Sequence, residues 1–167
     1  MIYFTADDHF SHSNIIKYCN RPFADAHDMN TTLTKNWNSV VKEEEDIIYV
    51  IGDFTMTHDE KHIAKLLEKL NGEKHLILGN HDRLKPFQYV DAGFMSVATS
   101  AVLKYNEWEF ILSHDPATAI IKPDRQFLCG HVHGLFLRCK NVLNVGVDLW
   151  DYKPVSIEQV TDYLLKN

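Results

Sequence analysis

The stretch Leu76-Ile77-Leu78-Gly79-Asn80-His81-Asp82 places three aliphatic residues directly before a glycine and three polar residues. The aliphatic run Leu76–Leu78 predicts a strand, and the glycine permits a tight turn where that strand ends. Asn80, His81 and Asp82 would then follow the carboxyl end of a strand, where α/β folds gather their ligands. This stretch therefore indicates both the class of fold and the position of a functional site.

Other predicted strands end in the same way. Each is followed within a few residues by Asp or His: Ile2–Thr5 by Asp7-Asp8-His9, Ile47–Ile51 by Gly52-Asp53, Glu107–Leu112 by Ser113-His114, and Gln126–Cys129 by Gly130-His131-Val132-His133. Since the carboxyl ends of neighbouring strands lie at one edge of a sheet, we expect these polar side chains to converge on one site.

Two segments of the first half have the spacing of amphipathic helices. The first has Asp28 as its expected N-cap and carries its apolar residues on one face: Met29, Leu33, Trp37, Val40 and Val41. The second, Asp59–Leu70, stops at Asn71-Gly72, which is a helix-ending signal. With the strands between them, the order is strand, helix, strand, helix, strand, which is typical of an α/β sheet with parallel members.

The second half has a different pattern, with short connections between its strands. We expect strands at Ser96–Lys104, Glu107–Leu112, Gln126–Cys129 and Val142–Val145, with a hairpin turn at Asn106 and a more antiparallel sheet as the result. A last helix would run from Ser156 to Leu165, because Ser156 and Gln159 form a capping-box pattern. The prediction is an α/β fold with two mixed β-sheets packed face to face and helices outside, in one domain over residues 1–167.

The composition excludes several classes of protein. A hydrophobic content of 45% and a charged content of 24% are ordinary for a soluble globular protein. No apolar run approaches the roughly 20 residues that span a bilayer, so we expect a cytoplasmic protein without a membrane partner. The net charge of −6 disfavours an extended nucleic-acid groove. Three cysteines without CxxC spacing indicate reduced thiols, and nothing in the sequence indicates an oligomeric state.

The side chains at the strand ends indicate a metal site. Carboxylate oxygen, amide oxygen and imidazole nitrogen together suit divalent Mn, Fe, Zn, Co or Ni. There are more of these groups than one ion uses, so two ions sharing a bridging carboxylate are the economical arrangement. Two ions about 3.5–4 Å apart can clamp the attacking and leaving oxygens of a phosphoryl centre. The positive charge of two divalent ions exceeds the negative charge of two aspartates and one hydroxide. The site would therefore have a net positive charge and attract a phosphate.

The motifs also resemble those of a known family. The series D-x-H at Asp7–His9, G-D at Gly52–Asp53, G-N-H-D at Gly79–Asp82, His114, and G-H-x-H at Gly130–His133 resembles, in this order, the calcineurin-like metallophosphoesterase superfamily. The chain looks like the small single-domain bacterial and phage members. The stretches His9–Ile16 and Asn144–Trp150 are similar to that subgroup as well. The resemblance implies a four-layer α-β-β-α sandwich and a dinuclear hydrolase of phosphate esters.

The resemblance also implies a role for each site residue. The first metal ion would be held by Asp7, His9 and His133, the second by Asn80, His114 and His131, and both by Asp53. Manganese is the first expectation, with iron, zinc, nickel or cobalt as alternatives. A hydroxide between the ions would attack phosphorus. His81 would contact the phosphate and protonate the leaving oxygen as the general acid, and Asp82 would orient His81.

Residues around these motifs allow weaker predictions. Asp8 stands where the family often has a smaller neutral residue, and it is either a solvated neighbour or a group that tunes the first metal or repels an anionic substrate. Substrate phosphate could be bound by Arg83, ranked first, by His12 or by Asn14, with Arg21 and Arg125 as further candidates. Trp150 and Tyr152 are expected to pack between a sheet and the last helix rather than to stack on a nucleobase.

Three functions are compatible with this pattern. We favour hydrolysis of a nucleotide-like phosphodiester, because the general acid His81 would help a poor leaving group most. Hydrolysis of small phosphomonoesters is the alternative. A metal-binding scaffold without activity is the third reading, which the presence of His81 and of every ligand position argues against.

Overall fold

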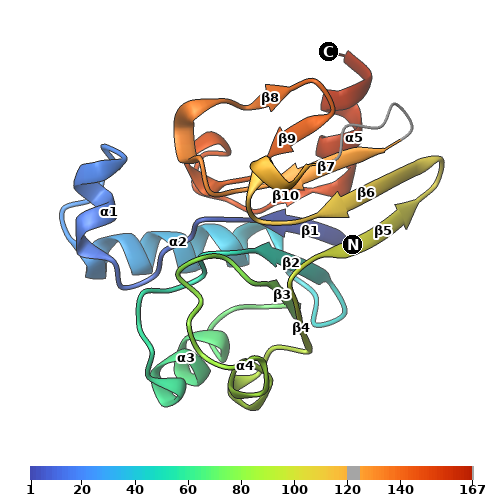
Figure 1. The fold of residues 1–167 in the computed structure, drawn as a ribbon. Coiled ribbons are helices and arrows are strands. Elements are labelled where there is room, and N and C mark those ends of the chain that lie inside the picture. The colour runs from blue at the N-terminus through green and yellow to red at the C-terminus, as the bar shows by residue number, and fades with distance from the viewer. Residues whose placement is uncertain (120–124, 167) are drawn as a thin grey trace.

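The computed structural model describes residues 1–119 and 125–166 and contains two five-stranded sheets. The first has the order β10-β1-β2-β3-β4, with β10 at Val155–Ser156, β1 at Ile2–Thr5, β2 at Ile47–Ile51, β3 at Glu73–Ile77 and β4 at Ser96–Ala98. The second has the order β5-β6-β7-β9-β8, with β5 at Ala101–Tyr105, β6 at Trp108–Leu112, β7 at Gln126–Cys129, β9 at Val142–Asn144 and β8 at Arg138–Cys139. Figure 1 shows the second sheet packed over the first, which confirms the predicted fold class.

Both sheets are mixed. Strands β1 to β4 are parallel, and β10 joins β1 in the antiparallel sense. In the second sheet β6, β7 and β9 are parallel to one another, whereas β5 and β8 lie antiparallel at the two edges. Among the described strands, the second sheet is therefore the more antiparallel of the two, as predicted, with two antiparallel pairings against one in the first sheet.

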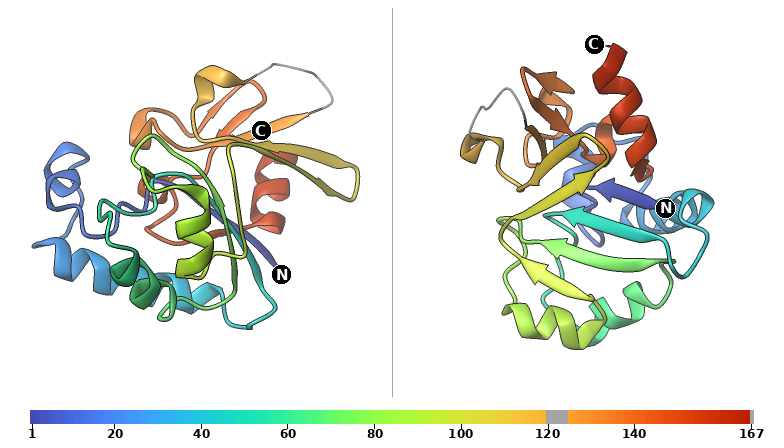
Figure 2. Two further views of the ribbon diagram at one scale, coloured as in Figure 1. Left: turned by 60° about the horizontal axis from the view of Figure 1, so that its bottom comes forward. Right: turned by 90° about the vertical axis from the view of Figure 1, so that its right-hand side faces the viewer.

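Five α-helices surround the sheets in the described part of the chain. They are α1 at Ser13–Tyr18, α2 at Ala26–Val40, α3 at Glu60–Leu67, α4 at Pro86–Ala92 and α5 at Ile157–Lys166. Short 3₁₀ turns follow several strands: η1 at Pro116–Thr118, η2 at His133–Leu135 and η3 at Val147–Leu149. Figures 1 and 2 show α3 and α4 on the side of the first sheet that faces away from the second sheet, and α1 at the end of the molecule beyond the strands.

The core is divided into layers by the alternation of side chains along the strands. In β2, Ile48 and Val50 pack with the helix residues Met29, Trp37 and Ile63. The neighbours Tyr49 and Ile51 point the other way, into a second cluster shared with Phe110, Leu128 and Val160 of α5. A smaller cluster on the far face of the second sheet contains Phe127, Cys129 and Val142, packed with Phe136. The apolar layer between the sheets holds the strand ends of both sheets in register.

The ends of helices α2 and α3 differ by a few residues from the predicted ends. Helix α2 begins at Ala26, because Asp25 accepts from the backbone N–H groups of His27 and Asp28 and acts as the N-cap in place of Asp28. Helix α3 ends at Leu67, three residues before the predicted Leu70. Ser156 and Gln159 form the predicted capping box.

The segment predicted as one strand at Ser96–Lys104 is two strands. Its first part, β4, pairs with β3, and its second part, β5, pairs with β6 of the other sheet. The chain crosses between the sheets at Thr99 and Ser100, which a run of β-forming residues does not reveal. Helices α1 and α4 were not predicted, since six and seven residues are too few to establish a helical period. Among the helices of the described residues, none has the length and apolar character to cross a membrane.

Candidate metal centre

The loops that follow the strands are held together by backbone hydrogen bonds. The N–H groups of Asp7 and His9 donate to the carbonyl oxygens of Gly52 and Asp53, each at 3.0 Å, so the loop after β1 lies along the loop after β2. The N–H of Val147 donates to the carbonyl of Ala6 at 3.0 Å and ties in the loop after β9. These bonds extend the sheet beyond its strands and leave the side chains of the loops free to point into the site.

Many of the predicted metal ligands have a strained backbone. Five of them adopt a positive φ although they are not glycine: Asp7 (57°), His9 (50°), Asp53 (56°), His131 (71°) and His133 (48°). Such a conformation costs of order 1–3 kcal/mol per residue and persists only where the surroundings enforce it. Strain concentrated at these positions indicates that the loops are shaped to place side chains, at some expense of stability.

Glycines allow the strand ends to approach one another. Gly52 has a φ of 85°, and a Cβ there would overlap the ring of His114 and lie 2.8 Å from the Cα of Gly79. A Cβ at Gly79 would overlap the carboxylate of Asp53 and lie 2.5 Å from its backbone nitrogen. The glycines of the G-D and G-N-H-D motifs are therefore required because a larger side chain at either position would collide with residues of the site.

The first group of ligands consists of Asp7, His9 and His133, whose ligand atoms all lie within 4.8 Å of one another. Asp7 and His9 are buried, and the Asp7 carboxylate accepts from the backbone N–H of His131 at 2.9 Å. Burial raises the pKa of Asp7 to about 6 and lowers the pKa of His9 to about 3. The His9 imidazole is therefore neutral at pH 7, which is the form that binds a metal ion.

His9 carries the clearest sign that a group belongs here. Both of its ring nitrogens are buried, and neither has a hydrogen-bond partner within the described part of the chain. Buried polar atoms are almost always paired, so an unpaired imidazole calls for a specific explanation. A divalent ion held by His9 together with Asp7 and His133 would supply it, and the donor types of these residues fit such an ion.

His133 is oriented by contacts of Asp148 and Arg21 that the sequence did not reveal. Its Nδ1 lies 3.0 Å from Oδ2 of Asp148, which leaves Nε2 for the first group. Asp148 in turn accepts two hydrogen bonds from Arg21, at 2.8 and 2.9 Å, and Arg21 also donates to the carbonyl oxygens of Asp7 and Asp8. A carboxylate behind a metal-binding histidine sets its tautomer and raises its basicity. Asp148 lies inside the stretch Asn144–Trp150, but a contact with a distant loop leaves no spacing pattern.

The second group consists of Asp53, His114 and His131, again with ligand atoms within 4.8 Å of one another. Asn80 joins it, because its Oδ1 lies 2.8 Å from Nδ1 of His131 and 3.2 Å from Nε2 of His114. His114 donates from Nδ1 to the carbonyl of Ile51 at 2.9 Å, so its Nε2 faces the group. All four side chains come from the ends of β2, β3, β6 and β7, as the sequence predicted.

Asp53 lies between the two groups. Its Oδ2 is 3.6 Å from Nε2 of His9 and 3.4 Å from Nε2 of His114. Burial alone would raise the pKa of Asp53, but His114 and the backbone N–H of His81 outweigh burial and lower it to about 2. Burial likewise opposes the charged form of His114, but the carboxylates of Asp53 and Asp7 raise its pKa to about 9. The structure thus brings together all seven predicted ligands, with Asp53 in the central position.

His81 and Asp82 lie beside the metal ligands but not in the expected relation. The ring of His81 is 5.4 Å from that of His9 and 6.4 Å from that of His12, measured between centroids. The carboxylate of Asp82 accepts from three backbone N–H groups, those of Gly79, Asp53 and Phe54. Within residues 1–119 and 125–166, no hydrogen bond joins Asp82 to the His81 ring. Asp82 therefore holds the loops after β2 and β3 together and does not orient His81 directly.

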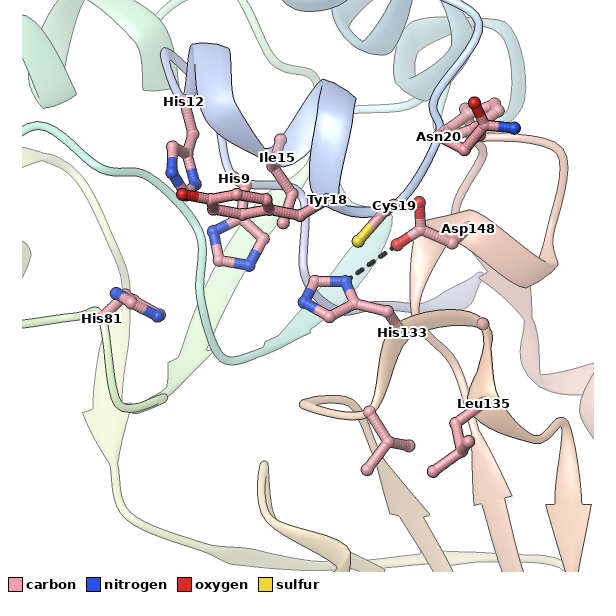
Figure 3. A pocket seen from close by; sticks show the side chains of 13 residues that line it. His9, His12, Ile15, Tyr18, Cys19, Asn20, His81, His133, Leu135 and Asp148 are labelled. Carbon is pink, nitrogen blue, oxygen red and sulfur yellow. Dashed lines mark hydrogen bonds and ion pairs between the residues drawn. The ribbon is translucent and has the colours of Figure 1, made fainter.

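A cavity of about 700 Å³ opens over the first group of ligands. Figure 3 shows the rings of His9, His12, His81 and His133 around it, with Tyr18 beside His9 and His12. Cys19 also lines the cavity, and its sulfur lies within 4.8 Å of ligand atoms of His133 and Asp148. The sequence had placed no cysteine near the site. Burial raises the pKa of Cys19 to about 11, so it is a neutral thiol at pH 7.

The predicted substrate-binding residues divide into two kinds. His12 lines the cavity, whereas Asn14 and Arg83 are exposed and are not among the lining residues. Arg83 directly follows His81 and Asp82 in sequence, but it is exposed and does not line the cavity. Arg21 is buried against Asp148, and Arg125 forms an ion pair with Glu109. Proximity in sequence was a poor guide for these arginines.

Asp8 is buried and not a solvated neighbour of the site. Its Oδ1 accepts from the Thr5 hydroxyl at 3.1 Å, its Oδ2 has no partner among the described residues, and burial raises its pKa to about 7. Trp150 has the packing role that was predicted, since its ring lies edge-on to Tyr163 of α5 and its N–H donates to the carbonyl of Asn144. Tyr152 packs against Phe23 at the wall of the cavity.

Comparison with known proteins adds the family. The model of the calcineurin-like phosphoesterases matches residues 2–153. The chain belongs to the calcineurin-like phosphoesterase family. This confirms the resemblance seen in the motifs and supports metal-dependent hydrolysis of a phosphate ester, for which the ligand groups are suited.

The relatives of this calcineurin-like phosphoesterase come from archaea, phages and bacteria. It is 38% identical to the uncharacterized protein MJ1445 of Methanocaldococcus jannaschii, over 99% of this chain and 92% of that protein. It is 26% identical to the gene 66 protein of Mycobacterium phage L5, over 96% of this chain and 92% of that protein. Among solved structures, the protein of unknown function AQ665 from Aquifex aeolicus is similar with a TM-score of 0.77 and 27% identity, covering 98% of both chains.

Proposed function

We propose that this calcineurin-like phosphoesterase is a dinuclear enzyme that hydrolyses phosphodiesters. The observation that carries the proposal is the position of Asp53, whose carboxylate oxygen lies 3.6 Å from His9 of one ligand group and 3.4 Å from His114 of the other. A carboxylate so placed can be shared by two ions. We propose that Asp7, His9 and His133 hold one ion, that Asn80, His114 and His131 hold the other, and that manganese is the first metal to test.

The chemistry of the site follows from the donors around it. Two bound divalent ions would polarise the phosphoryl oxygens and lower the pKa of a water molecule at neutral pH. Hydrogen bonds within the protein hold the proposed ligands in place. Arg21 and Asp148 position His133, the carbonyl of Ile51 positions His114, and Asp82 holds the loop that carries Asp53. Because these contacts exist before substrate binds, little reorganisation is needed when charge develops on phosphorus.

His81 is the proposed proton donor to the leaving oxygen. Its side chain reaches the cavity beside His9 and His12, and its Nδ1 is buried without a partner in the described part of the chain. Its backbone N–H donates to Oδ1 of Asp53 at 2.9 Å, so the position of His81 is coupled to that of the shared carboxylate. A donor within reach of the leaving oxygen contributes most where that oxygen is a poor leaving group, as in a diester.

The charges of the cavity favour a diester over a monoester. Among the described residues that line it, none is a lysine or an arginine, and Asp148 is already paired with Arg21 and His133. A diester carries one negative charge that the metal ions would neutralise. A monoester at neutral pH has a second charge, and the described lining residues include no lysine or arginine to pair with it.

The test compares a diester with a monoester on the same protein. The protein is stripped of metal, reloaded with Mn²⁺, and assayed with bis(4-nitrophenyl) phosphate and 4-nitrophenyl phosphate, with metal content measured by mass spectrometry. We expect two ions per chain, a higher kcat/KM for the diester, and little activity in His81→Ala. Faster turnover of the monoester would contradict the diester assignment. Turnover no higher than that of His81→Ala in a fully loaded protein would indicate a metal-binding scaffold.

A further inference from the structure

Tyr18 and Leu135 are large apolar side chains that are mostly exposed to solvent. Tyr18 is 75% and Leu135 78% exposed, the highest values among the large apolar residues of the described chain. Both line the cavity that holds His9 and His133. Scattered apolar residues on a surface need no explanation, but two that flank one cavity mark a place where an apolar ligand can be covered.

These two side chains stand on opposite sides of the cavity. Tyr18 ends helix α1, and its ring lies edge-on to that of His12, with centroids 6.4 Å apart. Leu135 ends the turn η2, which begins at the proposed ligand His133. Figure 3 shows Tyr18 beside His9 and His12, and Leu135 beyond His133. Both residues therefore stand next to proposed ligands of the first metal ion and away from those of the second.

The space between them is suited to an uncharged group. Ile15 and Val132 add apolar surface to its lining. Apart from the histidines, the only ionisable side chain that is charged at pH 7 among the described lining residues is Asp148, and its oxygens accept from Arg21 and His133. A second phosphate or a charged sugar substituent would find no partner here, whereas a flat ring could cover Leu135 and contact the face or edge of Tyr18.

We infer that Tyr18 and Leu135 form a subsite for a planar, uncharged organic group attached to the phosphorus atom of the substrate. An aryl ring and a nucleobase both have this chemistry. The inference rests on the proposed function for one point, the placement of the phosphoryl group at the metal centre. It adds the substrate class, diesters with at least one flat apolar substituent, and names the residues that select it.

Binding of two phosphonates tests the subsite without requiring turnover. Phenylphosphonate and methylphosphonate carry the same charged head and differ only in the group that would enter the subsite. Their dissociation constants are measured by calorimetry on the Mn²⁺-loaded protein. We expect phenylphosphonate to bind about tenfold more tightly than methylphosphonate, from contact of the ring with Tyr18 and Leu135.

Variants then assign that preference to the two residues. Tyr18→Ala and Leu135→Ala should each remove most of it, while Tyr18→Phe should keep it. Phe87→Ala and Leu165→Ala are matched controls, because Phe87 and Leu165 are 59% and 70% exposed and lie outside the cavity. All four positions are exposed at the surface, so folding of the five variants is expected to be intact and is checked by thermal unfolding.

The outcomes separate the subsite from the proposed activity. A phenyl preference that survives both alanine variants, or no preference in the wild-type protein, overturns the subsite even if diesters are hydrolysed. A preference lost in Tyr18→Ala supports the subsite even if no turnover is found. If neither phosphonate binds to the loaded protein, the subsite is overturned, whereas the proposed activity is judged separately by turnover of bis(4-nitrophenyl) phosphate. Comparing thymidine 5′-(4-nitrophenyl phosphate) with methyl 4-nitrophenyl phosphate then shows whether the subsite accepts a nucleobase or is restricted to aryl rings.

Discussion

The two ligand groups differ in how they are satisfied before metal binds. In the second group, His114 and His131 contact the Asn80 oxygen, and His114 also faces Asp53. In the first group, His9 is buried and neither of its ring nitrogens has a hydrogen-bond partner among the described residues, since Oδ2 of Asp53 is 3.6 Å from its Nε2. Protein contacts can thus substitute for an ion in the second group but not in the first. Without a bound ion, the buried nitrogens of His9 in the first group therefore lack a hydrogen-bond partner. In the second group, side chains that contact one another in the metal-free protein must give up some of these contacts when an ion binds.

The strongest test of this comparison is the residue that both groups share. Asp53→Asn should lower kcat/KM by about a thousandfold, because it removes the one carboxylate that faces both His9 and His114. Asp82→Asn should cost less, about 10–100-fold, because Asp82 acts by holding the loops. Steady-state kinetics on bis(4-nitrophenyl) phosphate measure both losses, and equal losses would contradict the bridging position.

A smaller effect is expected from the carboxylate behind His133. Asp148→Asn should weaken Mn²⁺ binding to the first group by about 10–100-fold, since an amide orients the imidazole less firmly than a carboxylate. Titration of the metal-free protein with Mn²⁺, followed by calorimetry, gives the affinities of the two ions. The neighbouring exposed residue provides the control, and Asp151→Asn should leave both affinities unchanged. If Asp148→Asn weakened binding only of the ion in the second group, the assignment of Asp148 to the first group would be wrong.

The two groups should also respond to pH with opposite signs in the metal-free protein. The pKa of His114 is raised from 6.5 to about 9, so its protonated form stabilises the fold below pH 6.5, and that contribution disappears as pH rises towards 9. The pKa of His9 is lowered from 6.5 to about 3, so its contribution becomes unfavourable as pH falls below 6.5.

Urea unfolding across this pH range measures both contributions. The destabilisation caused by His114→Gln should shrink between pH 6.5 and about 9. His9→Gln should become more stable relative to wild type as pH falls below 6.5. Parallel pH profiles for wild type and both variants would show that neither imidazole has the protonation state assigned to it.

The smallest effects should separate His12 from Arg83. His12 lies in the cavity with its ring 5.3 Å from that of His9, so His12→Ala should raise KM for a diester by about tenfold. Arg83 is exposed and outside the cavity, and Arg83→Ala should change kcat/KM by less than about twofold. A larger loss in Arg83→Ala than in His12→Ala would reverse this assignment.

Strands and their polar ends were predictable because the signal is local. Ile2–Thr5 and Ile47–Ile51 were assigned with the bounds that the structure has, since an apolar run of that length must be covered on both faces. The ligands then follow by position, because a parallel sheet brings the ends of its strands to one edge. The site could be assembled from residues as distant in sequence as Asp7 and His133 on that basis alone.

The break within Ser96–Lys104 could not be predicted in the same way. Both halves have β propensity, and only the separate pairing of β4 with β3 and of β5 with β6 divides them. The N-cap of α2 was misplaced by three residues: Asp25 and Asp28 are equally suited as caps by residue type, and in the structure the Asp25 carboxylate accepts from the backbone N–H groups of His27 and Asp28.

The sequence by itself determined the α/β class, the seven candidate ligands and His81, because each of these is encoded within a few residues of a strand end. Only the tertiary structure decided what supports them. It paired Arg21 and Asp148 behind His133, placed Asp82 on the backbone of two loops, and brought Tyr18 and Leu135 to one cavity. The physical reason is that strand periodicity and turn chemistry are short-range, whereas a contact between α1 and the turns after β7 and β9 depends on how two sheets pack.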